Sequence, residues 1–215
     1  MTFKEQLDAR AASTRKKIAA KKSEIIDNAT YALIQSNITK KTLKIGDSVN
    51  DLTLSNATNK PITLYNSLKN NRVVLSFYRG GWCPYCNMEL RALQNILPEI
   101  EANNAELIAI SPELPNASLT TSEKNELSFQ VLSDVDNKIA KEFGLVFKMP
   151  NELQNLYNNE FNIQVDKHNG NKDFELPLAA TYVINQNGKV IYDFVTENYT
   201  ERAEPIDIVN VLKNS

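Results

Sequence analysis

The only two cysteines of this 215-residue chain lie three positions apart, in the segment Cys83-Pro-Tyr-Cys86. Two thiols at this spacing can close a small disulfide on themselves, and in a reducing compartment such a pair is catalytic more often than structural. The thiolate is the nucleophile in this chemistry, whereas a free cysteine at neutral pH is mostly protonated. The spacing therefore predicts a redox site that must stabilise a thiolate.

An apolar strand pattern precedes the pair, and a helical pattern follows it. Residues 73–78 read Val-Val-Leu-Ser-Phe-Tyr, and leucines recur at helical spacing up to Leu97. Pro84 suits the first helical position, where its missing N–H leaves no bond unmade. Cys83 is then expected at the cap and Cys86 in the first turn. There the unpaired backbone N–H groups and the helix dipole favour an anion.

Paired cysteines also occur in structural zinc sites and as inert buried thiols. A structural zinc usually takes four protein ligands. His168 is the only histidine of the chain, so a closed site would need a second subunit. Inert burial is common for single cysteines, but not for a pair that brackets Pro-Tyr after a Gly-Gly turn. The redox interpretation is favoured, and it requires neither a metal nor another cofactor.

The composition of the whole chain excludes several classes of function. The formal charge is −2, and charges of both signs are scattered, which argues against nucleic acid as a partner. No apolar stretch approaches membrane-spanning length, and residues 1–22 contain no uninterrupted apolar block typical of a secretory signal. We therefore expect a cytoplasmic redox protein that does not associate with membranes.

Residues 1–42 are predicted to form a helical extension, and residues 43–215 to form one domain. One or two helices are expected in the extension, with apolar residues on a single stripe. The members of that stripe are Phe3, Leu7, Ala11, Ile18 and Ile25. Such a stripe must pack against another surface, and docking on the chain's own domain is favoured over a partner subunit.

Strand and helix patterns alternate through the rest of the chain. The predicted elements are a hairpin over 52–64, a strand over 73–78, a helix over 84–97 ended by Pro98, a strand over 105–110, a helix containing Leu119 and Leu127, a strand over 129–132, a helix after Asp134, a short helix over 152–157, strands over 181–184 and 190–194, and a helix near 204–213. Residues 145–176 are otherwise expected to be irregular and polar. The order predicts an α/β fold with a mixed sheet and helices on both faces.

Several segments match a known family in order and in register. They are Leu43–Asp47 with Leu52–Leu54, Val73–Cys86, Ile110–Pro112, Val131–Asp136 with Ile139–Gly144, and Ala180–Gly188. Together they resemble the peroxiredoxins of the thioredoxin-like superfamily, specifically bacterial proteins of the alkyl hydroperoxide reductase/thiol-specific antioxidant type. The resemblance covers roughly four-fifths of the chain. It implies a thioredoxin-like fold, with a central mixed β-sheet flanked by helices and an N-terminal helical extension.

The resemblance also assigns positions in the site. Cys86 falls on the peroxide-reactive cysteine of the family, and Glu89 falls on its following glutamate. The family signature is Pro-x-x-x-Thr-x-x-Cys, and here Arg79 stands in place of the proline and Cys83 in place of the threonine. By the same resemblance, Ala179 occupies the position of the family's arginine or that of the cis-proline of thioredoxins, so the usual arginine is absent there. Arg79 is therefore the nearest substitute by sequence, and its charge is expected to support the thiolate.

The activity that the resemblance implies is that of a thiol peroxidase acting on hydrogen peroxide or organic hydroperoxides. One thiolate attacks the peroxide and becomes a sulfenic acid, the other closes a Cys83–Cys86 disulfide, and a thioredoxin-type dithiol reduces it. The family spacing nominates Cys86 as the attacking residue, whereas the habit of CxxC proteins nominates Cys83, and both stay open. Peroxiredoxins are commonly dimers, so a homodimer is expected.

Two other functions fit the same residues. Cys83-Pro-Tyr-Cys86 also matches the glutaredoxin motif, so a thioredoxin/glutaredoxin-like disulfide oxidoreductase is the alternative enzyme. A redox-sensing binding module, whose N-terminal helix engages a partner according to the disulfide state, is the alternative outside enzymology.

Further residues near the pair receive roles on the same basis. The residues expected to line the substrate pocket are Tyr78, Trp82, Tyr85 and Glu89. His168 is interpreted as a solvated loop residue rather than a base. Arg202 lies in a tail segment, Tyr199–Pro205, that resembles the same subfamily. Its side chain either points towards the thiols, where it and Arg79 are the two candidates to replace the family's arginine, or pairs with a nearby acid at the surface; the surface position is slightly favoured.

Overall fold

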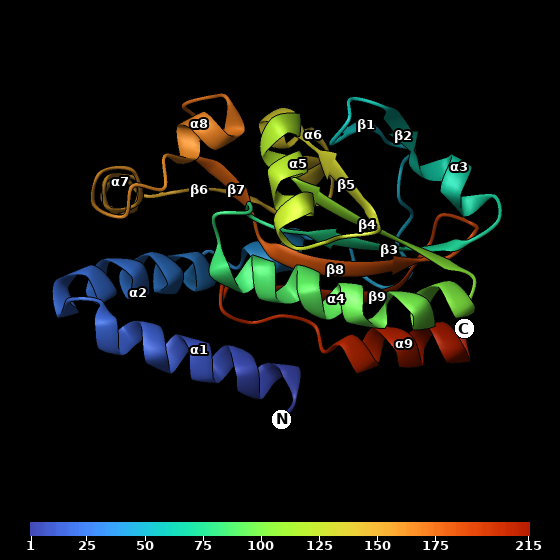
Figure 1. The fold of residues 1–215 in the computed structure, drawn as a ribbon, viewed down its shortest axis with the longest axis horizontal. Coiled ribbons are helices and arrows are strands. Elements are labelled where there is room, and N and C mark those ends of the chain that lie inside the picture. Colours follow the sequence, from blue (N-terminus) through green and yellow to red (C-terminus); the bar gives the residue numbers. More distant parts are fainter.

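The computed structural model describes all 215 residues and is built around a seven-stranded mixed sheet (Figure 1). Across the sheet the strand order is β2-β1-β5-β4-β3-β8-β9. Its strands are β1 (Thr53–Asn56), β2 (Pro61–Thr63), β3 (Arg72–Phe77), β4 (Ala105–Ser111), β5 (Gln130–Ser133), β8 (Ala179–Ile184) and β9 (Val190–Thr196). β3 runs parallel to β4 and antiparallel to β8. The remaining strands, β6 (Val146–Lys148) and β7 (Glu175–Pro177), pair with each other in a separate small sheet.

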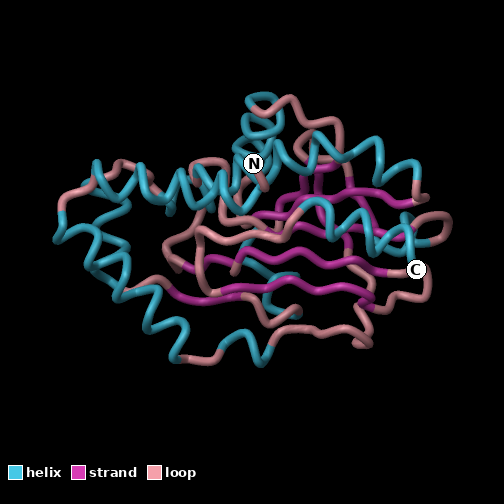
Figure 2. The backbone as a smooth tube through the Cα atoms, turned by 90° about the horizontal axis from the view of Figure 1, so that it is seen from below, coloured by secondary structure: helices cyan, strands magenta, loops and turns pink.

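Helices cover both faces of the sheet (Figure 2). They are α1 (Phe3–Lys17), α2 (Ala20–Gln35), α3 (Leu64–Leu68), α4 (Pro84–Ala102), α5 (Pro115–Lys124), α6 (Lys138–Glu142), α7 (Asn151–Asn155), α8 (Val165–Asn169) and α9 (Pro205–Asn214), with short 3-10 helices at Ile38–Lys41 and Val135–Asn137 and a π-helical turn at Leu156–Glu160. The predicted α/β fold, a mixed sheet flanked by helices with helices at the N-terminus, is confirmed.

Strand β3 shows how the sequence forms these layers. Its side chains alternate between the two faces, as the pleat of a strand requires. Val74 packs in the cluster that includes residues of α4 and α9, whereas Leu75 and Phe77 pack in the cluster that includes residues of α3 and α6. Both faces are buried, which explains why residues 73–78 read as an almost continuous apolar run. Each such side chain contributes about 1.5–3 kcal/mol through burial.

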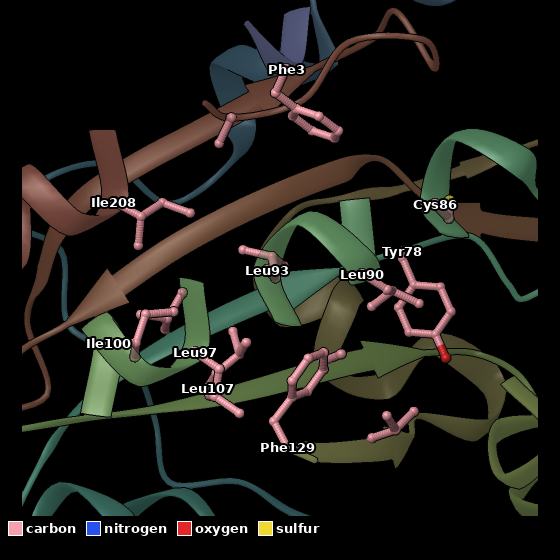
Figure 3. Packing of buried hydrophobic residues seen from close by; sticks show 14 of the residues in the cluster. Phe3, Tyr78, Cys86, Leu90, Leu93, Leu97, Ile100, Leu107, Phe129 and Ile208 are labelled. Carbon is pink, nitrogen blue, oxygen red and sulfur yellow. The ribbon is translucent and has the colours of Figure 1, made fainter. Parts of the chain in front are cut away.

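The N-terminal helices pack on the rest of the chain. Phe3 and Leu7 of α1 belong to the cluster formed with α4 and α9, and Phe3 faces that cluster in the close view (Figure 3). Ile26 of α2 packs in a second cluster with Leu153 and Leu156. The division of the chain at residue 43 stays a prediction, but α1 and α2 bury their apolar residues against this chain.

Local sequence rules were wrong at two places. Pro98 was expected to end the helix after the cysteines, yet α4 continues to Ala102. Pro98 lies on the exposed side of α4, whereas Ile100 beyond it is fully buried, so packing outweighs the lost backbone hydrogen bond. Residues 145–176 are not irregular: they form β6, α7, α8, β7 and the π-helical turn. None of the helices is both long and apolar enough to span a membrane.

Candidate active site

The two cysteines lie where the sequence places them, at the junction of β3 and α4. Cys83 caps the N-terminus of α4, Pro84 takes the first helical position, and Cys86 follows in the first turn. Both thiols are free, and both are buried, with 2% of Cys83 and none of Cys86 exposed. The helix N-terminus directs unpaired N–H groups and the positive end of the helix dipole towards these sulfurs.

The turn between strand and helix requires its two glycines. Gly80 has φ +148°, and a Cβ there would lie 2.3 Å from Nε1 of Trp82. A Cβ on Gly81 would lie 1.9 Å from the Thr121 hydroxyl oxygen. The Gly81 N–H donates to Oε2 of Glu113, at 2.9 Å. The turn is therefore held in one conformation by contacts that larger residues would break.

His168 is not the solvated residue that the sequence suggested. Its Nδ1 lies 3.0 Å from Oε1 of Glu113, the same carboxylate that accepts the Gly81 N–H. The ring is about one-third exposed, and the Glu113 side chain is almost fully buried. His168 thus supports the glycine turn through Glu113, a role that a lone histidine in a polar segment does not announce.

Arg202 is the largest correction at the site, because it is buried at the thiols rather than exposed at the surface. Its Nη2 donates to Sγ of Cys86 at 3.1 Å, and its Nε forms an ion pair with Glu89. Its Nη1 donates to the carbonyl oxygens of Tyr199 and Glu201. A guanidinium with its donors used in this way is fixed in place, with its charge directed at one sulfur.

Glu89 is buried as the counter-ion of this arginine. Besides Arg202, it accepts a long hydrogen bond from the Thr181 hydroxyl, at 3.5 Å. Burial raises the pKa of Glu89 to about 7, opposed by the positive charge of Arg202 and reinforced by the charge of Cys86. The contacts of Glu89 are therefore with Arg202 and Thr181. Its role as a substrate-binding residue stays a prediction.

Arg79 is also buried, but it is surrounded by aromatic rings rather than by a carboxylate. Its guanidinium carbon lies 5.1 Å from the ring centroid of Trp82, 5.3 Å from that of Tyr199 and 5.7 Å from that of Tyr157. Its Nη2 donates to the Tyr157 hydroxyl at 3.1 Å. Its positive charge contributes to lowering the pKa of both thiols, and its role as a catalytic residue stays a prediction.

The two thiols act as a pair. The pKa of Cys83 is lowered to about 5, chiefly because Cys86 hydrogen-bonds to its sulfur, and also by the charges of Arg79 and Arg202, while burial opposes the shift. Burial and the neighbouring Cys83 thiolate raise the pKa of Cys86. The pair therefore carries one proton and one negative charge at neutral pH. The charge is shared across a hydrogen bond between two buried sulfurs.

The aromatic residues expected around the pair take different positions. Trp82 packs edge-on against Tyr157, with ring centroids 5.7 Å apart. Tyr85 packs edge-on against Tyr199 at 5.5 Å. Tyr78 is fully buried below Cys86, with its hydroxyl directed away from that sulfur (Figure 3). Trp82 therefore contacts Arg79 directly, Tyr85 contacts the Tyr199 ring that also faces Arg79, and Tyr78 is buried in the core. The role of all three as substrate-binding residues stays a prediction.

The sequence did not assign Tyr157, Tyr199, Glu113 or Asn87 to the site. Asn87 donates to the carbonyl oxygens of Gly81 and Cys83, which fastens the turn to the helix. Its position four residues after Cys83 was the only available signal, since residues four apart meet on a helix. Tyr157 reaches Arg79 from a distant π-helical turn, and no local pattern marks it.

The fold and the site together define a thioredoxin-like protein with a dithiol at a helix N-terminus. Comparison with known sequences identifies the family: the profile of the AhpC/TSA family matches residues 45–193. The chain belongs to the AhpC/TSA family.

Relatives and a solved structure agree with this assignment. A putative peroxiredoxin bcp of Buchnera aphidicola subsp. Schizaphis graminum is 34% identical over 104 residues, which cover 48% of this chain and 65% of that protein. A putative peroxiredoxin bcp of Haemophilus influenzae is 29% identical over 103 residues, which cover 48% of this chain and 66% of that protein. The matched segment thus spans just under two-thirds of each relative. The crystal structure of peroxidoxin BcpB from Mycobacterium tuberculosis superposes with a TM-score of 0.65 at 22% identity, covering 80% of this chain and 97% of that one.

Proposed function

We propose that this protein is a thiol peroxidase that reduces hydroperoxides with Cys86 and regenerates through a Cys83–Cys86 disulfide. The observation that carries the proposal is the bond from the Arg202 guanidinium to Sγ of Cys86, with Glu89 fixing that arginine from behind. Such a charge stabilises a thiolate before the reaction and the developing negative charge during it. Cys83 precedes Cys86 by three residues, about one helical turn, and is within reach for a disulfide.

The chemistry then follows in three steps. The lower pKa of Cys83 places the shared proton on Cys86 at rest, so the proton first moves across to Cys83, and the charge that this leaves on Cys86 is stabilised by Arg202. The Cys86 thiolate then attacks one oxygen of the peroxide, which breaks the O–O bond. Cys86 becomes a sulfenic acid, and the leaving alkoxide or hydroxide takes the proton of Cys83 and departs as alcohol or water. Cys83, now a thiolate, attacks the sulfur of the sulfenic acid, which breaks the S–O bond, and the leaving hydroxide takes a proton from solvent to become water. The lowered pKa of Cys83 keeps that second nucleophile available at neutral pH.

A dithiol reductant of the thioredoxin type completes the cycle. Its thiolate attacks Cys83, which is slightly more exposed than Cys86, and the Cys86 thiolate leaves towards Arg202. A second thiol of the reductant then releases the mixed disulfide. We place the reaction in a reducing compartment such as the cytoplasm, where a disulfide formed by turnover is reduced again. A homodimer is part of the proposal by analogy with the family.

The alternative, a disulfide oxidoreductase of the thioredoxin or glutaredoxin kind, receives less support. The family match and the named relatives are peroxiredoxins. In addition, the buried arginine contacts the second cysteine of the motif, which is the position that the resemblance assigns to peroxide attack. In thiol–disulfide exchange the more exposed first cysteine is the nucleophile. That reaction does not require a buried arginine at the second cysteine.

The test uses Trp82, the only tryptophan, which lies next to Cys83 in the chain. Reduced protein is mixed with hydrogen peroxide or cumene hydroperoxide, and fluorescence is followed by stopped flow beside Cys83→Ser and Cys86→Ser. We expect a fast phase that is first order in peroxide, retained by Cys83→Ser and lost in Cys86→Ser. In Cys83→Ser, a sulfenic acid should be trapped by dimedone. A wild-type rate no faster than that of a free thiol would exclude the proposal, and a reversed pattern would make Cys83 the attacking residue.

A further inference from the structure

A pocket of about 200 Å³ lies beside Arg79, at some remove from the Cys86 side of the site. Its walls are largely apolar and come from α2 and from the segment β6–α7. The apolar side chains are Ile26, Ala29, Leu33, Phe147, Leu153, Tyr157 and Tyr199. The pocket is smaller than the 300–1,000 Å³ typical of sites for drug-sized molecules, so it suits a small ligand. Two of its lining residues, Tyr157 and Tyr199, also face Arg79 through their rings.

Arg79 itself lines the pocket with an incompletely satisfied guanidinium. Only 4% of the residue is exposed, its Nε has no hydrogen-bond partner, and it forms no ion pair with any carboxylate. A buried cation without a counter-ion is costly, and the surrounding aromatic rings offset only part of that cost. Apart from the Tyr157 hydroxyl, which accepts its one hydrogen bond, the groups that follow Arg79 in the same turn and share a negative charge are the two thiols, and the Cys83 N–H donates to the carbonyl oxygen of the adjacent Gly80 at 3.1 Å. The thiolate is therefore the counter-ion of Arg79 in the reduced protein.

Oxidation removes that counter-ion. A Cys83–Cys86 disulfide carries no charge, so Arg79 is left buried and uncompensated. Arg202 differs because Glu89 remains beside it in either state. We propose that the pocket binds a small monocarboxylate with a short apolar chain, and that it binds this ligand more tightly when the cysteines form a disulfide. The redox dependence rests on the dithiol cycle proposed above, whereas the pocket and its arginine do not.

The other charges of the pocket fix the orientation of the ligand. Lys148 lines it and forms no ion pair, so it adds positive potential. Glu197 lines it too and accepts a hydrogen bond from the Thr39 hydroxyl. A carboxylate would be repelled near Glu197 and attracted to the guanidinium of Arg79. The apolar chain then lies against Ala29 and Leu33 of α2, a helix of the N-terminal extension.

Linkage gives the functional consequence. A ligand that binds the oxidised form more tightly stabilises the disulfide and makes the protein harder to reduce. We expect about a tenfold difference in affinity, which corresponds to a reduction potential lower by about 30 mV at saturation. The effect is regulatory: the carboxylate slows return to the dithiol without touching either sulfur.

The experiment titrates octanoate into reduced protein and into protein oxidised with diamide, following Trp82 fluorescence. Octanamide has the same chain without the charge, and acetate has the charge without the chain. Ala29→Phe fills the pocket, and Ala12→Phe, on the exposed side of α1, is its matched control. We expect saturable binding of octanoate that is about tenfold tighter in the oxidised protein. Ala29→Phe should lose it and Ala12→Phe should keep it. Arg79→Gln should bind octanoate more weakly and with equal affinity in the two redox states.

Each outcome decides the proposal. Absence of saturable binding, equal affinity in the two redox states, or equal binding of octanamide would overturn it. Because diamide forms the disulfide without peroxide, octanoate binding can be found even if the stopped-flow test excludes a peroxidase. Conversely, a fast peroxide reaction with no octanoate binding would leave the proposed function intact and reject the pocket. A similar thermal midpoint of Ala29→Phe and wild type shows that loss of binding is not loss of folding.

Discussion

Two buried arginines flank the same pair of thiols, and their surroundings differ completely. Arg202 bonds to Cys86, pairs with Glu89 and donates to two carbonyl oxygens. Arg79 donates one hydrogen bond, to Tyr157, and is otherwise surrounded by aromatic rings. Above pH 7, where Glu89 is mostly ionised, the charge of Arg202 is thus compensated whether or not the thiolate is present. The charge of Arg79 is compensated only in the dithiol state, so only this side of the site changes its electrostatics with oxidation.

The largest effect is expected from removing the paired arginine. Arg202→Met leaves Glu89 buried without its counter-ion, and breaking a buried ion pair in this way costs about 3–5 kcal/mol. The measurement is the free energy of unfolding from urea denaturation of the reduced protein. Arg91→Met is the control, because Arg91 is exposed and bonds only to the neutral Asn125 side chain. A loss below about 1 kcal/mol, which is typical of exposed pairs, would contradict the comparison.

A double variant sharpens this test. Glu89→Gln with Arg202→Met removes both charges, so the cost of the second change should be smaller than its cost alone. Coupling of residues in contact is usually 0.5–3 kcal/mol. We expect a value at the upper end of that range, since Glu89 and Arg202 are both almost fully buried. Additive losses would mean that the pair is not what stabilises this side of the site.

Arg79 should affect the thiols more than it affects folding. Arg79→Met removes a positive charge near the pair, so the pKa of Cys83, about 5 in the intact site, should rise by about 1–3 units. The observable is the pH midpoint of alkylation by iodoacetamide, because the rate rises with pH as the thiolate forms. Arg79→Lys keeps the charge and should shift the midpoint less. An unchanged midpoint in Arg79→Met would show that this arginine does not act on the thiolate.

The pH dependence of stability also distinguishes the Arg202–Glu89 side of the site from the Arg79 side. The pKa of Glu89 is raised to about 7, so between its ordinary value near 4.5 and 7 the folded protein keeps a proton that the unfolded chain releases. Stability contributed by this group therefore falls as pH rises through that window, by about 2 kcal/mol. Glu89→Gln should lack this slope. Unfolding free energies of the two proteins that differ by a constant from pH 5 to 7 would contradict the assignment.

The same contrast explains what the sequence could predict. The placement of Cys83 and Cys86 followed from local rules, since a strand pattern, a Gly-Gly turn and Pro84 define the helix start. Arg79 was nominated because it is close in sequence. Arg202 is 116 residues from Cys86, on a segment without helix or strand, so no periodicity indicates where its side chain points. Its location depends on packing across the whole fold, as does the continuation of α4 past Pro98.

The smallest effect is expected at the single hydrogen bond of Arg79. Tyr157→Phe keeps the ring that faces the guanidinium but removes the hydroxyl that accepts from Nη2, which leaves a buried donor unpaired. The loss of unfolding free energy should be about 1–3 kcal/mol. Tyr199→Phe is the matched control, because its ring also faces Arg79 whereas no hydrogen bond joins its hydroxyl to that side chain. Equal losses in the two variants would mean that the rings, and not the hydroxyl, position Arg79. A larger loss in Tyr157→Phe would show that the Tyr157 hydroxyl, a neutral acceptor, helps to hold Arg79 in place, as the Glu89 carboxylate holds Arg202.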